Sequence, residues 1–451
     1  IIKNICDNQY NIFGWDYKTR PSLFIDNHNN IIKSDFDLVL PPEGSLNLSF
    51  PDWVTIKFIN SNLVKLLQKE FSVKTLRDLR NKLSFFNVQE YSFSNFIRSI
   101  ITSGREIIKN DEKNTDIIQQ LLKILFEIYK NKSIEQFPET IQVPIFNNKS
   151  VLKNAGNLYF GKEYKIGNLA YNLLKNVNSS IFLADKNTLG FNELDEDELI
   201  DFFRWLGVSQ YPKATIKELK ENYSEYRLYA LKNLNYPLDF RGEVYRNYDE
   251  LKKELNSYTK ISIQDIEYFD EILAKAEIEY IFAWFIKDSN VYDIIRTGKE
   301  KSNASKLSLS LYRKIYWRTI TGQEISAYVY WKLTTLSWIH THAGKKKVSN
   351  CCLENLSLSP LIESPKFNPS SSIFRDYGIE LKDINFMLLK LGIIEDIKSL
   401  SWSVIYSLLL DLPEKDPDGK IARSFYNQII KDKSVETLDS DDEKYQEFMK
   451  T

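Results

Sequence analysis

Apolar residues recur at helical spacing along most of the chain. In residues 115–130 they return every three or four positions, which predicts an amphipathic helix. Residues 194–206 begin with a run of acidic side chains and are followed by Gly207, an order typical of a helix that ends at a glycine. The longest helical pattern covers residues 262–285, and we expect a single helix there. The wider segment 213–340 is predicted to be mainly helical.

Strand patterns are confined to short regions. Residues 21–33 consist of two apolar runs separated by polar, turn-forming residues, which predicts a hairpin. Residues 141–154 show the same order, with Asn147 in the turn, and a further short strand is expected soon after. The sequence therefore predicts an α+β fold that is predominantly α-helical, with small β units near 9–60 and 138–185.

Changes in these patterns divide the chain into five expected segments. They are a β-rich segment (1–60), a helical domain (61–135), an α+β unit (136–215), a helical domain with a basic stretch (216–350) and a C-terminal helical unit with an acidic tail (351–451).

Composition narrows the class of protein without naming a partner. The net charge is −1 in 451 residues, so overall charge favours neither nucleic acid nor an acidic ligand. Three cysteines do not make a disulfide framework, which favours a cytoplasmic location. No apolar run approaches the roughly 20 residues that a membrane span needs, so no membrane association is expected. The sequence begins at Ile1 rather than Met, as a piece of a longer protein would.

Two segments of the chain end a helix in the same way. Leu206, Gly207 and Val208 follow one predicted helix, and residues 391–393 repeat the Leu-Gly-aliphatic order after another. A short link and a second helix are expected to follow in each case, in "ATIKEL" after the first ending and in "LSWSVI" after the second. We interpret the two segments as copies of one supersecondary unit.

The residues around the first copy resemble a family. "VPIFNNKSVLKNAGNLYFGKEY", followed by "FLAD" and "FFRWLGVSQYP", resembles a unit of sacsin-like proteins, in which a proline-containing strand, a polar turn, a "YFG" segment and a helix ending in Trp-Leu-Gly-Val recur. The stretch "LSWSVIYSLLLDLPEKDPDGKIARSFYNQII" is similar to the C-terminal part of large bacterial proteins that carry a sacsin-type ATPase. The resemblance covers about half of the chain, and its motifs are structural rather than catalytic.

The resemblance implies a role but no active site. Sacsin-like proteins usually carry a GHKL-type ATPase, which binds its nucleotide through an Asn-bearing helix and a D-x-G-x-G loop, and this chain has no D-x-G-x-G. We therefore expect a region downstream of the ATPase module, with no cofactor of its own. The implied function is a non-enzymatic scaffold or interaction region, chaperone-like or part of an anti-phage defence system. Its partners would be other proteins or other domains of the same polypeptide.

One segment superficially matches a phosphate-binding loop. Gly156, Gly161 and Lys162 fit the pattern G-x-x-x-x-G-K. The loop interior holds bulky residues that favour burial, and Glu163 stands where a Ser or Thr would bind magnesium. A carboxylate at that position repels phosphate, so we interpret the segment as two turns around a buried aromatic pair.

Other catalytic or metal-binding patterns are weak. His340, His342, Cys351 and Cys352 are all potential zinc ligands, but adjacent cysteines point to opposite faces of a strand, so we expect no metal site. Carboxylates are too numerous for a catalytic pair to be chosen, so the catalytic residues stay unknown. A hydrolase is a third interpretation.

The basic stretch 296–347 supports a second interpretation. It holds eleven Lys or Arg residues against two Glu, with aromatic residues between them, a combination that suits phosphate backbones and stacked bases. The alternative function is therefore a nucleic-acid-binding or nucleic-acid-processing component of a bacterial defence system. The interpretation that we favour for this stretch is nevertheless that its aromatic residues belong to a core and its cations face water or acidic surface elsewhere. A helix that begins at Ser310 is one of two expected conformations for this stretch. The candidate nucleic-acid contacts are Arg313, Lys314, Arg318, Lys345, Lys346 and Lys347.

Overall fold

The structure is a computed structural model, and it groups into two compact units. The first unit comprises residues Ile1–Tyr171 and Ser179–Gln210, and the second comprises Asn172–Asn178 and Tyr211–Thr451. The five-segment division stays a prediction. The structure describes residues 1–7, 23–32, 38–41, 48, 50–56, 58–110, 115–131, 136–138, 140–219, 224–233, 239–240, 243–244, 246–255, 259–301, 306–312, 315–321, 324–354, 358 and 361–432.

The beginning of the first unit combines short helices with the first predicted hairpin. Ile25 and Ile31 form an antiparallel bridge, and the backbone N–H of Asp26 donates to the carbonyl of Asn30 at 2.8 Å, which confirms the turn. The side chain of Asn60 accepts from two N–H groups of the helix that follows and so caps it. The elements are α1 (Ile2–Asp7), β1 (Val39–Leu40), α2 (Ser61–Glu70), α3 (Leu76–Lys82), η4 (Ser84–Phe86) and β2 (Gln89–Glu90), with β1 and β2 paired in parallel.

Three longer helices enclose the core in the rest of the first unit. Leu121 and Leu125 on α5 and Phe202 on α7 are completely buried, as the helical spacing predicts. The side chain of Asp195 caps α7, and Gly207 follows its end at φ +98°, so the predicted glycine ending is confirmed. The elements are α4 (Phe93–Asn110), α5 (Thr115–Lys130), β3 (Pro144–Phe146), β4 (Leu152–Asn154), η5 (Ala155–Asn157), α6 (Asn168–Leu174) and α7 (Glu196–Trp205).

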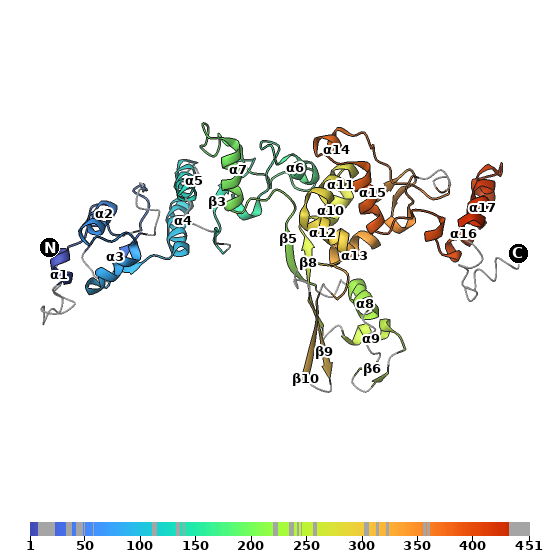
Figure 1. Cartoon of the computed structure of the whole chain (residues 1–451), viewed down its shortest axis with the longest axis horizontal. Coiled ribbons are helices and arrows are strands. Elements are labelled where there is room, and N and C mark those ends of the chain that lie inside the picture. The colour runs from blue at the N-terminus through green and yellow to red at the C-terminus, as the bar shows by residue number, and fades with distance from the viewer. Residues whose placement is uncertain are drawn as a thin grey trace. The chain divides into compact units, whose positions relative to one another are not determined.

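A four-stranded antiparallel sheet in the second unit departs from the expected helices. Its order is β10-β9-β8-β5, and in Figure 1 β9 and β10 extend away from helices α10–α13. The expected helix over 262–285 is wrong, because its beginning belongs to β8 and two helices follow. Ile263 and Ile266 are both buried at a spacing of three, which also fits a helix. The elements are β5 (Ala214–Leu219), α8 (Ser224–Asn233), β6 (Asp239–Phe240), β7 (Glu243–Val244), α9 (Tyr248–Leu255), β8 (Thr259–Ile266), β9 (Lys306–Tyr312) and β10 (Ile315–Thr321). A helix from Ser310 is therefore also wrong.

The helical body of the second unit is built around large aromatic residues. Trp284 is completely buried, and its Nε1 donates to the carboxylate of Asp288 at 3.1 Å. Trp338 is also buried and donates to the carbonyl of Leu333 at 2.8 Å. The polar atoms of both indoles thus have partners, as buried tryptophans require. The elements are α10 (Phe269–Lys275), α11 (Ile278–Lys287), α12 (Ser289–Thr297), α13 (Tyr328–Thr335), β11 (Ile339–Thr341), β12 (Gly344–Lys346), η6 (Val348–Asn350), α14 (Ser372–Asp376) and α15 (Leu381–Lys390).

The C-terminal part of the second unit has a separate hydrophobic cluster. Trp402, Ile405 and Phe425 are buried in it, and they come from two consecutive helices. The elements are η7 (Ile397–Ser399), α16 (Trp402–Lys415) and α17 (Lys420–Asp432). The fold as described is α+β and mostly helical, which confirms the predicted class. No helix among the described residues is both long and apolar enough to cross a membrane.

Two parts of the chain share one hydrogen-bonded module. Each begins with a short hairpin, β3–β4 in the first unit and β11–β12 in the second, and each hairpin leads into a 3₁₀ turn, η5 or η6. An extended segment then makes a parallel bridge to the residue that lies just beyond a helix ending in Leu-Gly-aliphatic. These bridges join Tyr159 to Ser209 and Cys352 to Ile394.

The hydrogen bonds of the two copies correspond pair by pair. The N–H of Ser209 donates to Leu158 at 3.0 Å, and that of Ile394 donates to Cys351 at 2.9 Å. The helices end alike, because Gly207 and Gly392 adopt φ +98° and +89°. Two further pairs of bonds are equivalent. The N–H of Tyr159 donates to Ile181 as that of Cys352 donates to Glu363, and the N–H of Ala184 donates to Phe146 as that of Lys366 donates to His340. The predicted repeat of the helix ending is therefore present, and it belongs to a larger module. The second helix expected in each copy is wrong for the first copy, because Ala214–Leu219 form strand β5, whereas α16 follows the second copy.

Candidate functional site: a pocket beside the second hairpin

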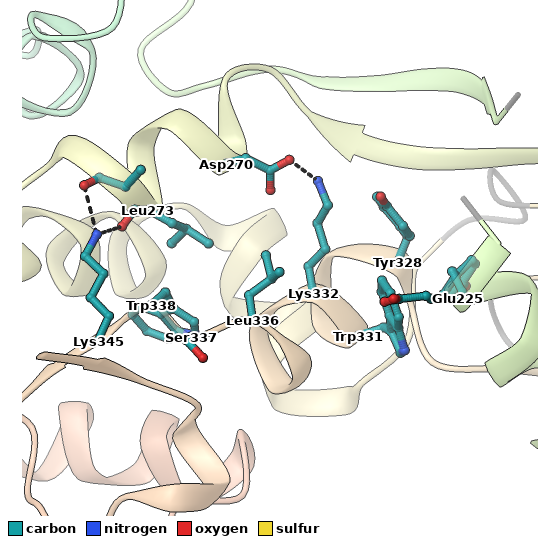
Figure 2. Close-up of a pocket in the computed structure, with 12 residues that line it drawn as sticks. Glu225, Asp270, Leu273, Tyr328, Trp331, Lys332, Leu336, Ser337, Trp338 and Lys345 are labelled. Carbon is teal, nitrogen blue, oxygen red and sulfur yellow. Dashed lines mark hydrogen bonds and ion pairs between the residues drawn. The ribbon is translucent and has the colours of Figure 1, made fainter. Parts of the chain in front are cut away.

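A pocket in the second unit is the candidate functional site. It lies between α10 and α13 and has a cavity volume of about 480 Å³, within the range of small-molecule and peptide sites. Figure 2 shows Lys332 crossing it from α13 toward Asp270, with Lys345 at one end and Glu225 at the other. The pocket therefore combines charged groups of both signs with aromatic walls.

The ammonium group of Lys332 is buried among acidic and aromatic groups. Its side chain is 7% exposed, and Nζ lies 2.8 Å from the carboxylate of Asp270 and 3.7 Å from that of Asp265. The same Nζ is 4.9 Å from the centre of the Tyr328 ring. Lys217 contacts Asp265 at 3.1 Å from the sheet side. Buried charges persist only when they are paired, and here two lysines face two aspartates.

Lys345 closes the end of α10. Its Nζ donates to the carbonyl oxygens of Leu273 and Ala274 at 3.0 and 2.8 Å, two of the acceptors that the last turn of a helix leaves without partners. A cation at this end also interacts favourably with the helix dipole. Loss of hydration around the ammonium lowers the pKa of Lys345. In the first copy of the module the equivalent position is Leu152, so this contact belongs to the second copy alone.

We expect Lys345→Ala to lower the free energy of unfolding of the second unit by about 1 kcal/mol, since it removes two charge-assisted hydrogen bonds at a partly solvated helix end. Urea titration followed by tryptophan fluorescence measures the change. Lys347→Ala is the matched control, because this lysine is exposed and contributes nothing to the pocket. Equal effects of the two substitutions would contradict the role assigned to Lys345.

Aromatic rings form the wall at the opposite end. Tyr226 and Tyr328 meet edge to face with centroids 5.0 Å apart, and Trp331 stacks on Tyr328 at 5.9 Å. The hydroxyl of Tyr226 donates to the carbonyl of Ser326, and burial raises its pKa. Trp331 keeps part of its surface exposed, unlike the two tyrosines. The wall is therefore rigid, and one large ring of it remains accessible to a ligand.

Two carboxylates lie beside these groups. The side chain of Asp270 is 59% exposed although it bonds to Lys332. Glu225, in the first turn of α8, is exposed, and its side chain makes no hydrogen bond or ion pair to any part of the chain that the structure describes. Among the charged side chains of the pocket, Asp270 and Glu225 thus make the fewest hydrogen bonds and ion pairs with described residues.

That the predicted nucleic-acid contacts share one surface stays a prediction. Arg313 and Lys314 lie outside the described residues, and Arg318 is placed by its backbone on the edge strand β10, opposite Leu309. Lys345 is bound to α10. Lys346 and Lys347 follow it along and beyond β12.

The proposed histidine and cysteine ligands do not form a metal centre in the described parts of the chain, where no group of three His, Cys, Asp or Glu side chains could hold a metal ion. Both cysteines are buried, and their thiols contact different backbone carbonyls. The thiol of Cys351 lies 3.4 Å from the carbonyl oxygen of Lys347, and that of Cys352 lies 3.1 Å from the carbonyl oxygen of Ile362. Burial raises the pKa of Cys351 to about 11. These thiols therefore serve packing rather than chemistry.

The segment that resembles a phosphate-binding loop is a structural turn. Tyr159 and Phe160 are buried, and the N–H of Phe160 donates to Ser209, so it is not free to bind phosphate. Lys162 lies 3.9 Å from Glu163 and above the ring of Tyr171. This arrangement agrees with the buried aromatic pair expected from the sequence.

Comparison of the chain with protein-family models, with curated proteins and with solved structures gave no match. The site must therefore be interpreted from its own geometry. Sequence reasoning missed Asp265, Asp270 and Lys332, because partners 62 residues apart leave no local pattern. One signal was available, since a lysine within the apolar segment "AYVYWKL" requires a buried partner or an exposed position.

Proposed function

We propose that this chain is a non-enzymatic interaction region of a sacsin-like protein linked to a GHKL-type ATPase, chaperone-like or part of an anti-phage defence system. The observation that carries the proposal is the duplicated module. The residues that resemble sacsin-like proteins form its first copy, and a second copy occurs in the other unit. Repeated supersecondary units commonly serve as scaffolds that present binding surfaces.

The chemistry of the pocket supports binding rather than catalysis. Its two lysines are engaged by carboxylates and by helix carbonyls, so neither is poised as a nucleophile. The thiols nearest to it in sequence, Cys351 and Cys352, are buried, and a raised pKa at Cys351 disfavours the reactive thiolate.

Internal pairing is the reason for preferring an interaction region to a nucleic-acid-binding component. Four of the cations between 296 and 347 are held by groups of the same unit. Arg296 and Lys301 pair with Asp293, Lys332 pairs with Asp270, and Lys345 binds carbonyls. Fewer cations are then available to bind phosphate than the sequence suggests. The salt-dependent, electrostatic part of the free energy of nucleic-acid binding is therefore smaller.

An interaction region should not bind nucleotide by itself but should associate with the ATPase module of its own protein. We expect calorimetry with ATP and magnesium to detect no binding to residues 1–451. The same chain, added to the separately expressed ATPase module, should form a complex in analytical ultracentrifugation and change the rate of ATP hydrolysis.

Lys162→Ala provides the control for the nucleotide experiment. Micromolar ATP binding by the wild-type chain that is lost in this variant would restore the phosphate-loop interpretation and refute the proposal. Absence of any complex with the ATPase module would refute the scaffold role.

A further inference from the structure

We propose that the pocket between α10 and α13 binds an arginine or lysine side chain of a partner polypeptide. The inference deepens the proposed interaction role and rests on it for the choice of a polypeptide. Nothing in the sequence motifs points to this site. The argument depends on which charges of the pocket the protein already neutralises and which it leaves.

The cations of the pocket are occupied by the protein. Lys332 is almost fully buried and bonds to Asp270, and its Nζ also lies above the rings of Tyr328 and Phe269 at 4.9 and 5.7 Å. Lys345 uses two of its three donors on the carbonyls of α10. An anionic ligand could therefore reach only the third donor of Lys345 without breaking an existing bond of these two lysines.

The acceptors of the pocket are only partly used. One carboxylate oxygen of Asp270 accepts a hydrogen bond from Lys332, and more than half of the Asp270 side chain is exposed. Glu225 has no partner among the described residues and lies beside Trp331 in Figure 2. Ser337 adds a hydroxyl on the same lining. A ligand with a positively charged head would therefore find carboxylate oxygens that the described residues leave without a partner.

The walls fit the rest of a basic side chain. Trp331 offers a partly exposed indole, the ring that attracts cations most strongly, and Leu336 and Leu273 offer apolar surface to an alkyl stem. The cavity of about 480 Å³ also leaves room for neighbouring residues of a peptide. Lys332 shows that this environment accepts such a group, because its own ammonium is held between a carboxylate and an aromatic ring.

The test uses the full chain of 451 residues and three capped peptides that differ at one position. The probe acetyl-Gly-Leu-Arg-Leu-Gly-amide is compared with the same peptide carrying citrulline, a neutral isostere of arginine, and with one carrying glutamate. Tryptophan fluorescence titrations at low salt measure the dissociation constants. We expect the arginine peptide to bind about threefold to tenfold more tightly than the citrulline peptide, and the glutamate peptide to bind most weakly of the three.

Two matched variants connect this preference to the pocket. Glu225→Gln removes a carboxylate that has no partner among the described residues. It is expected to weaken binding of the arginine peptide by about threefold to tenfold while leaving binding of the citrulline peptide unchanged. Glu414→Gln makes the same change on α16, which contributes no residue to the pocket, and is expected to have no effect. Equal binding of the arginine and citrulline peptides, or no effect of Glu225→Gln, would overturn the inference. Tighter binding of free arginine than of the peptide would overturn its choice of a polypeptide.

The outcomes separate this inference from the proposed function. Selective binding of the arginine peptide together with no complex between the chain and an ATPase module would support the pocket and refute the scaffold role. The opposite result is a chain that does not bind the arginine peptide but forms a complex with the ATPase module, equally well as wild type and as Glu225→Gln. That result would support the scaffold role and refute the pocket.

Discussion

Replacing Lys332 with methionine is expected to lower the free energy of unfolding of the second unit by about 3–5 kcal/mol. Asp265 is 5% exposed, and Lys332 is the buried cation beside it, so the substitution leaves this carboxylate with the half-exposed Lys217 as its remaining cation among the described residues, in a place that water hardly reaches. The methylene stem of methionine keeps most of the packing, so the loss reports chiefly on charge. Hydrogen exchange of β8 and α13 amides measures the change within the unit.

Two controls separate the buried charge from general damage. Lys217→Met removes the other cation from Asp265, but this lysine is 46% exposed, so the expected cost is below about 1 kcal/mol. Combining Lys332→Met with Asp265→Asn removes the stranded charge and should restore part of the lost stability, a coupling that a double-mutant cycle quantifies. A loss below about 1 kcal/mol in Lys332→Met alone would mean that water reaches Asp265.

Local signals predicted well those elements whose ends are specified within a few residues. The acidic start of α7 and the left-handed Gly207 at its end both follow from nearby chemistry, and both are found. The hairpin at 144–154 follows from its polar turn, and the side chain of Asn147 there accepts from the N–H groups of Lys149 and Val151. In these places the sequence pattern and the tertiary structure impose the same local conformation.

The sheet of the second unit could not be found by the same reasoning. β8 pairs with β5, more than forty residues earlier, and with β9, a similar distance later. Ile263 and Ile266 satisfy a helical spacing, and only the partner strands decide between the two structures. The pairing also places Asp265 opposite Thr215, where Lys217 from the neighbouring strand can reach its carboxylate. The missed sheet and the missed charge cluster therefore have one cause, which is that their partners are distant in sequence.

The duplicated module shows how structure extends a weak sequence signal. Only the Leu-Gly-aliphatic ending is shared visibly, because Gly207 and Gly392 must both adopt a left-handed conformation. The hairpins differ in sequence and in turn length, so their equivalence appears only in their backbone hydrogen bonds. Leu152 and Lys345 occupy corresponding positions, and this one difference turns a core contact into the wall of a pocket.

The second large effect is expected for Trp402→Ala, which should lower the stability of the C-terminal helical cluster by about 3–5 kcal/mol. Trp402 is 8% exposed and packs with Ile405 of its own helix and Phe425 of α17. Trp402 is the largest buried side chain of the cluster, whose other buried members on these two helices are Ile405, Leu408, Leu412, Phe425 and Ile429, so its truncation leaves the largest cavity between them. Hydrogen exchange of the amides in these two helices measures the change.

Trp205→Ala is the natural comparison, since Trp205 is the last residue of α7, the helix of the first copy, and packs in the core cluster of the first unit. Trp205 is only partly buried, and its ring packs on Phe137 and Tyr129 at centroid distances of 4.9 and 5.5 Å in the first unit. Its truncation should therefore cost less and should affect amides of α5 and α7 but not those of α16 and α17. Trp402→Phe should retain most of the stability, because a large ring still fills the site. If Trp402→Ala altered exchange by less than about 1 kcal/mol, the tryptophan would not be an anchor and the cluster would depend on its aliphatic residues instead.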